Sequence, residues 1–112
     1  PPPRRTLIST PTDDRRDLLT VIASMRAKPG REQALREALE ALVAPTAKEA
    51  GYVNYDLHQG VEDPAVFALY ENWESGEALD AHLAAPHLQQ FVGRMDDLLD
   101  GGLQISRLRR IG

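Results

Sequence analysis

The clearest alternation of apolar and polar positions lies at residues 67–73, in the sequence FALYENW. A period of two predicts a β-strand, and it places Phe67, Leu69, Glu71 and Trp73 on the same face of a sheet. The predicted core face of this strand therefore also carries a carboxylate and the single tryptophan of the chain.

Three further stretches are predicted strands. Residues 18–27 are largely apolar on both faces and end at the turn sequence Lys28-Pro29-Gly30. Residues 52–59 place Val53, Tyr55, Leu57 and Gln59 on one face, and a last strand is expected near residues 103–108. Because a strand that is apolar on both sides is usually covered on both sides, the first strand predicts a packing layer against each face of the sheet.

Apolar residues at helical spacing predict helices between the strands. Residues 30–50 form an amphipathic pattern that Pro45 should kink or restart. Ser75 is a suitable N-cap for a helix that carries His82 among its apolar positions, and Pro86 suits the first position of the next helix. The expected inward stripe of that helix is Leu88, Phe91, Val92 and Met95.

The order strand, helix, strand, strand, helix, strand is typical of an α+β fold of the ferredoxin-like, split βαβ type, with helices on one face of an antiparallel sheet. The chain has 112 residues, enough for one domain, which we assign to residues 18–112 after a flexible, proline-rich tail at residues 1–17. The uncovered sheet face predicts a symmetric homodimer that packs sheet against sheet.

Composition narrows the function classes. A formal net charge of −4 gives no basic surface for nucleic acid. The sequence offers no apolar run long enough for a membrane span or a signal peptide, so a cytoplasmic location is expected. The absence of cysteine excludes disulfides, a thiol nucleophile and thiolate metal sites. The sequence has no GxGxxG or GxxxxGK motif for a nucleotide cofactor, so no cofactor is expected.

Residues 18–110 resemble the antibiotic biosynthesis monooxygenase family, small dimeric α/β-barrel proteins that include cofactor-free quinol and anthrone oxygenases. Two motifs carry the resemblance, EXW followed by HLXXPH and GYXXYXLH, and their residues here are Glu71, Trp73, His82, Leu83, Pro86 and His87, then Gly51, Tyr52, Tyr55, Leu57 and His58. The resemblance implies the dimeric barrel fold and a reaction between a small aromatic substrate and dioxygen.

A cofactor-free oxygenase needs an apolar slot for a flat ring and a base that helps form the substrate anion. Trp73 is the candidate ring-facing wall and His82 the candidate proton acceptor, while Glu71 could orient His82 or transfer protons. The expected substrate-binding residues are Tyr55, Met25, Phe67, Leu83 and Phe91.

Each candidate also has a structural interpretation. Trp73 could be a core residue, and His82 could be a buried histidine hydrogen-bonded to nearby backbone. Burying Glu71 is unfavourable without a partner, so pairing with Arg26 or Arg94 is expected if it has no catalytic role. His58 and His87 are expected to be structural or surface residues.

Metal and haem sites are not predicted. His82 and His87 are five residues apart, which would separate them by about 140° on one helix, and no HxxxH or HExxH motif is present. A strand tryptophan with a helix histidine also resembles the haem-degrading branch of the superfamily. That branch uses an asparagine in the first strand, where this chain has Ala23-Ser24-Met25-Arg26.

The leading hypothesis is therefore a cofactor-independent monooxygenase that acts on a small quinol, anthrone or phenolic aromatic. Two alternatives keep the same pocket. One is an isomerase that uses His82 and Glu71 to move protons on a small carbonyl or sugar-phosphate compound. The other is a non-catalytic dimeric module that only binds a ligand.

Overall fold

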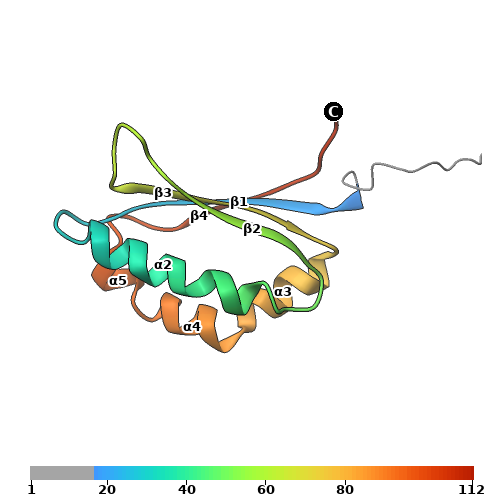
Figure 1. Cartoon of the computed structure of the whole chain (residues 1–112). Helices are drawn as coiled ribbons and strands as arrows, with labels where there is room; N and C mark the ends of the chain where they lie inside the picture. The colour runs from blue at the N-terminus through green and yellow to red at the C-terminus, as the bar shows by residue number, and fades with distance from the viewer. Residues whose placement is uncertain (1–16) are drawn as a thin grey trace, which may run out of the picture.

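A computed structural model describes residues 17–112 as a four-stranded antiparallel sheet with one face covered by helices (Figure 1). The elements in chain order are β1 (Leu19–Arg26), α2 (Glu32–Thr46), β2 (Tyr52–Gln59), β3 (Val66–Trp73), α3 (Gly76–Ala84), α4 (Pro86–Val92), α5 (Met95–Leu98) and β4 (Gln104–Leu108). The order of strands across the sheet is β2-β3-β1-β4. This architecture confirms the predicted ferredoxin-like α+β fold. The predicted tail lies outside the described residues except for Asp17.

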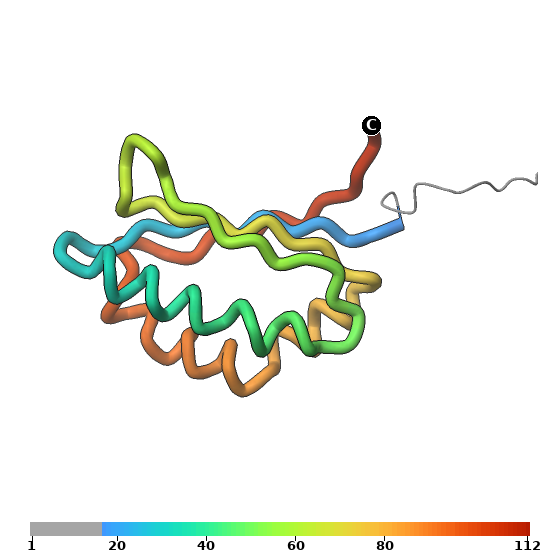
Figure 2. Tube along the Cα trace, viewed as in Figure 1, coloured from blue at the N-terminus to red at the C-terminus, as the bar shows by residue number. Residues whose placement is uncertain are grey.

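The hydrophobic core fills the space between the sheet and the helices. Figure 2 shows α2 and α4 running along the same face of the sheet. The inward residues of β3 alternate as the sequence predicts, with Phe67, Leu69, Glu71 and Trp73 all buried. From α2 the buried leucines are Leu35, Leu39 and Leu42. The core thus presents one carboxylate and one indole from the same strand to the covering helices.

A β-bulge in β2 changes the face that was predicted for Val53. Tyr52 pairs with Trp73 and Asn54 pairs with Asn72, so Val53 is the extra residue. A bulged residue leaves the alternation of its strand, and Val53 is accordingly exposed rather than aligned with Tyr55. The bulge brings Tyr52 to the helix-covered face as well, where its ring meets the edge of Trp73.

The helix predicted for residues 30–50 is shorter than expected, because α2 ends at Thr46. Pro45 lies in its last turn and has no N–H for the helical hydrogen-bond ladder. The chain leaves the helix in tight turns, with the Lys48 N–H donating to the Pro45 carbonyl and the Glu49 N–H to the Thr46 carbonyl. This exit places Glu49 in a connection rather than on a helix face.

Gly51 completes the same connection. Its φ of +80° lies in the left-handed region that favours glycine. A Cβ at this position would stand 2.4 Å from the Cβ of Ala78 on α3, so glycine also allows the connection to pack closely against that helix. Glu49 is therefore held near α3 by the backbone around it.

The helix predicted from Pro86 divides into two. Pro86 is at the start of α4, as expected, but α4 ends at Val92, and Met95 begins the short α5. Leu88 and Phe91 are buried, whereas Val92 is exposed and does not belong to the inward stripe. The break at Gly93 and Arg94 turns the chain and separates Met95 from the helix that carries Leu88 and Phe91.

The opposite face of the sheet has no covering layer within the described chain (Figure 1). Ile22 on β1 and Tyr70 on β3 are paired neighbours on this face and are 42% and 44% exposed. Leu108 on β4 lies on the same face, opposite Thr20. Among residues 17–112, no helix is both long and apolar enough to cross a membrane.

Candidate active site

A pocket lies between the helix-covered face of the sheet and the helices. The space between its lining atoms is about 430 Å³, a volume that includes open solvent at its mouth. Three polar side chains line it, Tyr55, Glu71 and His82. The remaining lining is apolar and comes from Val21, Ala23, Met25, Leu39, Leu42, Leu69, Leu83, Leu88, Phe91, Leu103 and Ile105.

Most of the predicted site residues meet at this pocket. Met25, Tyr55, Leu83 and Phe91 line it, together with Glu71 and His82. Trp73 and Phe67 are buried nearby but are not among the lining residues. Trp73 instead packs against His82, with ring centroids 4.6 Å apart. Trp73 therefore packs against His82 from outside the pocket and does not form the ring-facing wall that was expected.

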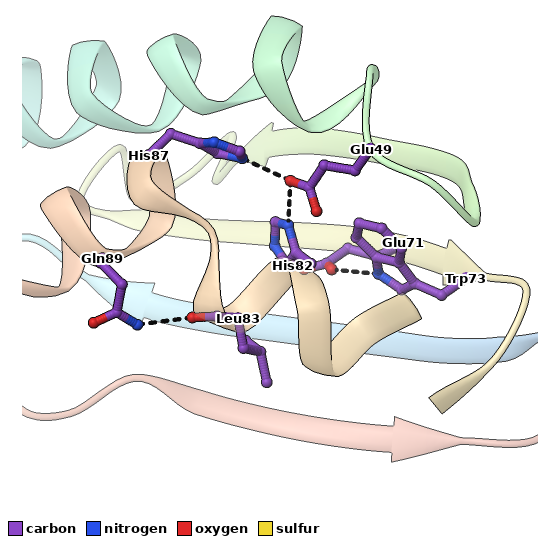
Figure 3. Close-up of polar contacts among 7 residues, drawn as sticks. All are labelled: Glu49, Glu71, Trp73, His82, Leu83, His87 and Gln89. Carbon is purple, nitrogen blue, oxygen red and sulfur yellow. Dashed lines mark hydrogen bonds and ion pairs between the residues drawn. The ribbon is translucent and has the colours of Figure 1, made fainter. Parts of the chain in front are cut away.

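Glu71 is a buried carboxylate held by a neutral donor. Its side chain accepts a hydrogen bond from Nε1 of Trp73 at 2.9 Å (Figure 3). Burial raises the pKa of Glu71 to about 7, the hydrogen bond from Trp73 opposes this rise, and the carboxylate of Glu49 adds to it. Glu71 can therefore take up or release a proton near neutral pH.

The predicted partners of Glu71 are wrong. Arg26 instead pairs with Asp63 at 2.6 Å, at the exposed end of β1. Arg94 is exposed in the break between α4 and α5. The carboxylate is satisfied without a cation, because Trp73, two residues further along the same strand, donates its indole N–H.

His82 projects from α3 into the core, where it is 2% exposed. Its Nδ1 lies 2.9 Å from Oε2 of Glu49 (Figure 3), and its ring also contacts the edge of Tyr55. Burial lowers the pKa of His82, and the hydrogen bond to Glu49 opposes that effect. Because a carboxylate oxygen only accepts, Nδ1 of the neutral ring carries the hydrogen and Nε2 keeps a free lone pair.

Glu49 is the residue that sequence reasoning missed. The residue that orients His82 through a hydrogen bond is Glu49, rather than Glu71, for which this role was one of two considered. The same oxygen of Glu49 lies 2.6 Å from Nε2 of His87. Of the two possibilities expected for His87, structural or surface, the structure favours the structural one, since its side chain is only 22% exposed. Glu49 stands two residues before Gly51, in the connection that follows the helix end at Pro45 and Thr46, and these two breaks are the local signal for its position.

Glu49, His82 and His87 come together at the junction of three segments. One nitrogen or oxygen atom from each lies within 4.8 Å of the others. Spacing along a single helix did not predict this grouping. Ala85 is extended, with ψ of 147°, and the turn it makes between α3 and α4 brings the two imidazoles to the same carboxylate.

Relatives share both the sequence and the fold. The profile of the family described as "Antibiotic biosynthesis monooxygenase" matches residues 18–94. The chain is similar to "Putative monooxygenase Rv0793" of Mycobacterium tuberculosis, with 35% identity over 80% of this chain and 88% of the relative. It is also similar to "Probable quinol monooxygenase YgiN" of Escherichia coli, with 34% identity over 79% of this chain and 95% of the relative.

A solved structure agrees with these sequence matches. The crystal structure of PA3566 from Pseudomonas aeruginosa superposes on this chain with a TM-score of 0.81 and 38% sequence identity. The match covers 86% of this chain and 96% of the other. The sequence match therefore extends over most of the domain and is accompanied by the same fold. The chain belongs to the antibiotic biosynthesis monooxygenase family.

Proposed function

We propose that this protein is a cofactor-independent monooxygenase that oxidises a small quinol, anthrone or other phenolic aromatic with dioxygen. The observation that carries the proposal is an apolar pocket lined by two proton-transfer groups, the imidazole of His82 and the carboxyl of Glu71, whose pKa is raised to about 7. The monooxygenase names of the relatives support the reaction class, and the name of the Escherichia coli relative supports a quinol.

The proposed reaction begins with removal of a proton from the substrate. Nε2 of His82 accepts a proton from a ring hydroxyl, or from the acidic CH₂ of an anthrone, and Glu49 stabilises the resulting imidazolium through Nδ1. The hydroxyl of Tyr55 donates a hydrogen bond to the substrate anion. Burial, and then the nearby Glu71 carboxylate, raise the pKa of Tyr55, so this donor stays protonated.

The electrons then come from the substrate itself. The anion passes one electron to dioxygen, and the substrate radical and superoxide combine into a peroxide at ring carbon. Loss of the hydrogen that remains on that carbon leaves its electron pair to form the new C=O bond and breaks the O–O bond. One oxygen atom stays as a new carbonyl or hydroxyl, and the other leaves as water after protonation by Glu71 or the His82 imidazolium. For an anthrone, CH₂ and O₂ give C=O and H₂O.

The open face of the sheet supports a homodimer in this proposal. Ile22 and Tyr70 form an apolar centre on it, with Thr20 and Asn72 hydrogen-bonded beside them. Packing a second copy there would bury both faces of β1. Light scattering should give twice the 12.4 kDa of one chain, and Ile22→Asp should give monomers. A monomeric wild-type protein would refute the dimer.

Oxygen consumption tests the reaction. The purified, metal-free protein is given a reduced naphthoquinol or an anthrone, and only the increment above spontaneous oxidation counts. His82→Ala should reduce this increment at least about tenfold, because general-base catalysis typically contributes that much or more. His58→Ala is the matched control, since His58 is an exposed histidine on β2. No increment with any ring substrate would argue against an oxygenase.

The outcomes also separate the other function classes. Product formed equally well without dioxygen would indicate an isomerase that uses the same acid and base. Thermal stabilisation by an aromatic ligand with no product would indicate a binding module.

A further inference from the structure

We propose that Glu49, His82 and His87 form a binding site for one divalent transition-metal ion such as Zn²⁺. The site stands beside the pocket rather than inside it, since Glu49 and His87 are not among the pocket-lining residues. Only His82 belongs to both. The inference goes beyond the proposed oxidation, because metal binding is measured without any substrate.

The positions of the three ligand atoms carry the proposal. Oε2 of Glu49 lies 2.9 Å from Nδ1 of His82 and 2.6 Å from Nε2 of His87 (Figure 3). Around a tetrahedral zinc with bonds of about 2.1 Å, neighbouring ligand atoms stand about 3.4 Å apart. Each of the two nitrogens must therefore move less than about 1 Å away from Oε2 of Glu49 to hold the ion, and the ligand atoms all lie within 4.8 Å of one another. A set already this close is nearly arranged for coordination.

The kinds of donor atom indicate which ions fit. Two imidazole nitrogens and one carboxylate oxygen suit Zn²⁺, Co²⁺ and Ni²⁺, whereas Mg²⁺ and Ca²⁺ prefer oxygen ligands throughout. Three protein ligands also leave the fourth tetrahedral position for water. The site should therefore discriminate strongly against the two alkaline-earth ions.

Two of the three ligands are accessible and able to move, and the third is held in the core. The side chains of Glu49 and His87 are 14% and 22% exposed, so an ion can reach them from solvent. Glu49 lies in the connection after α2, where its side chain can shift without disturbing a helix. His82, in contrast, is packed between the rings of Trp73 and Tyr55. The buried histidine thus forms a fixed point toward which the other two ligands adjust.

Binding would change the role of His82. A metal on Nδ1 replaces the hydrogen bond to Glu49 and leaves the remaining hydrogen of the neutral ring on Nε2. Nε2 then donates instead of accepting. An occupied site would therefore suppress proton abstraction by His82, which makes metal binding and the proposed oxidation mutually exclusive.

Metal titration of the untagged, chelator-treated chain tests the inference. Calorimetry with Zn²⁺ should give one ion per chain with micromolar or tighter affinity, and Co²⁺ should produce the visible absorption bands of a tetrahedral site. His87→Gln should weaken Zn²⁺ binding at least about tenfold by removing one ligand. His58→Gln should leave it unchanged, because His58 lies outside the cluster. Mg²⁺ should give no heat of binding.

Glu49→Gln is the second variant, and it keeps the shape of the side chain while removing the carboxylate. It should also weaken Zn²⁺ binding at least about tenfold, with circular dichroism of each variant checking the fold. The proposal is overturned by the absence of Zn²⁺ binding below millimolar concentration. It is equally overturned if both variants bind as well as the wild type, or if His58→Gln loses as much affinity as they do.

Discussion

Nε1 of Trp73 donates a 2.9 Å hydrogen bond to the carboxylate of Glu71, two residues earlier on the same face of β3. The alternation of a strand is what places the two side chains together. The donor is neutral, so it satisfies the carboxylate without a full opposite charge. Glu71 can therefore be buried and still titrate near neutral pH.

Trp73→Phe should lower the free energy of unfolding by about 2–4 kcal/mol, because it leaves a cavity and removes the donor from a buried carboxylate. Urea denaturation measures the change. Val61→Ala is the control, since Val61 is 98% exposed in the loop between β2 and β3, and it should change the free energy of unfolding by less than about 0.5 kcal/mol.

Repeating Trp73→Phe in a Glu71→Met protein separates the contribution of the hydrogen bond from that of the cavity. In Glu71→Met, no carboxylate remains to be left unpaired. The loss of stability caused by Trp73→Phe should therefore be smaller in this background than in the wild type, by at least about 1 kcal/mol. An equal loss in both backgrounds would mean that the hydrogen bond contributes nothing to stability.

The raised pKa of Glu71 should make stability fall as pH rises. The folded protein keeps a proton on Glu71 up to about pH 7, whereas the unfolded chain releases it near its ordinary pKa of 4.5. Between these values the folded state binds more protons, so the free energy of unfolding decreases by up to about 3 kcal/mol and then levels off. Urea denaturation at several pH values measures this slope.

Glu71→Gln should lack that decrease. His82 contributes a slope of the opposite sign, because its pKa is lowered by burial, but this contribution is common to both proteins. The difference in stability between Glu71→Gln and the wild type should therefore grow in favour of the variant from about pH 5 to about pH 8. A difference that is constant across this range would contradict a raised pKa at Glu71.

Glu49 should stabilise the fold by joining α3 and α4 to the connection before β2. Glu49→Ala leaves two imidazole N–H groups without their acceptor, and we expect it to lower the free energy of unfolding by about 1–3 kcal/mol. Glu40→Ala is the control, since Glu40 makes an exposed i,i+4 pair with Arg36, and such pairs contribute about 0.3–0.5 kcal/mol.

Glu49 and His87 should also be coupled in their effects on stability. Once Glu49 is alanine, His87→Ala should have a smaller effect on unfolding than in the wild type, because their shared hydrogen bond is already lost. Strictly additive effects in urea denaturation would show that the short contact contributes no stability.

The fold could be predicted because its signals are local. Alternation in residues 67–73, the N-cap at Ser75 and the proline at the start of α4 each depend on neighbours in the sequence. The same periodicity placed Glu71, Trp73 and His82 on the buried side. These residues were identified because burial of a polar group on an apolar face is visible in the pattern itself.

The arrangement of the site could not be predicted in the same way. The contact between Glu49 and His87 joins residues that are 38 positions apart, and it depends on where α2 ends and how Ala85 turns. A proline near a helix end is compatible with either a kink or the end of the helix, and the sequence pattern does not distinguish the two. The bulge at Val53 is likewise a property of strand pairing.

A last prediction compares two buried alanines, Ala23 in β1 and Ala27 directly after it. Ala23 lines the pocket, whereas Ala27 is buried outside it. Ala23→Val should place two added carbons in empty space and leave the free energy of unfolding unchanged or raised by up to about 1 kcal/mol. Ala27→Val should overpack the core and lower it by about 1–3 kcal/mol.

Urea denaturation of both variants, followed by the oxygen-uptake assay, completes this comparison. Because the valine at position 23 occupies substrate space, Ala23→Val should raise KM even though the protein is as stable as the wild type. Equal destabilisation by the two valines would mean that no usable space exists beside Ala23. The pocket would then be too small for a ring substrate, and the proposed oxidation would lose its binding site.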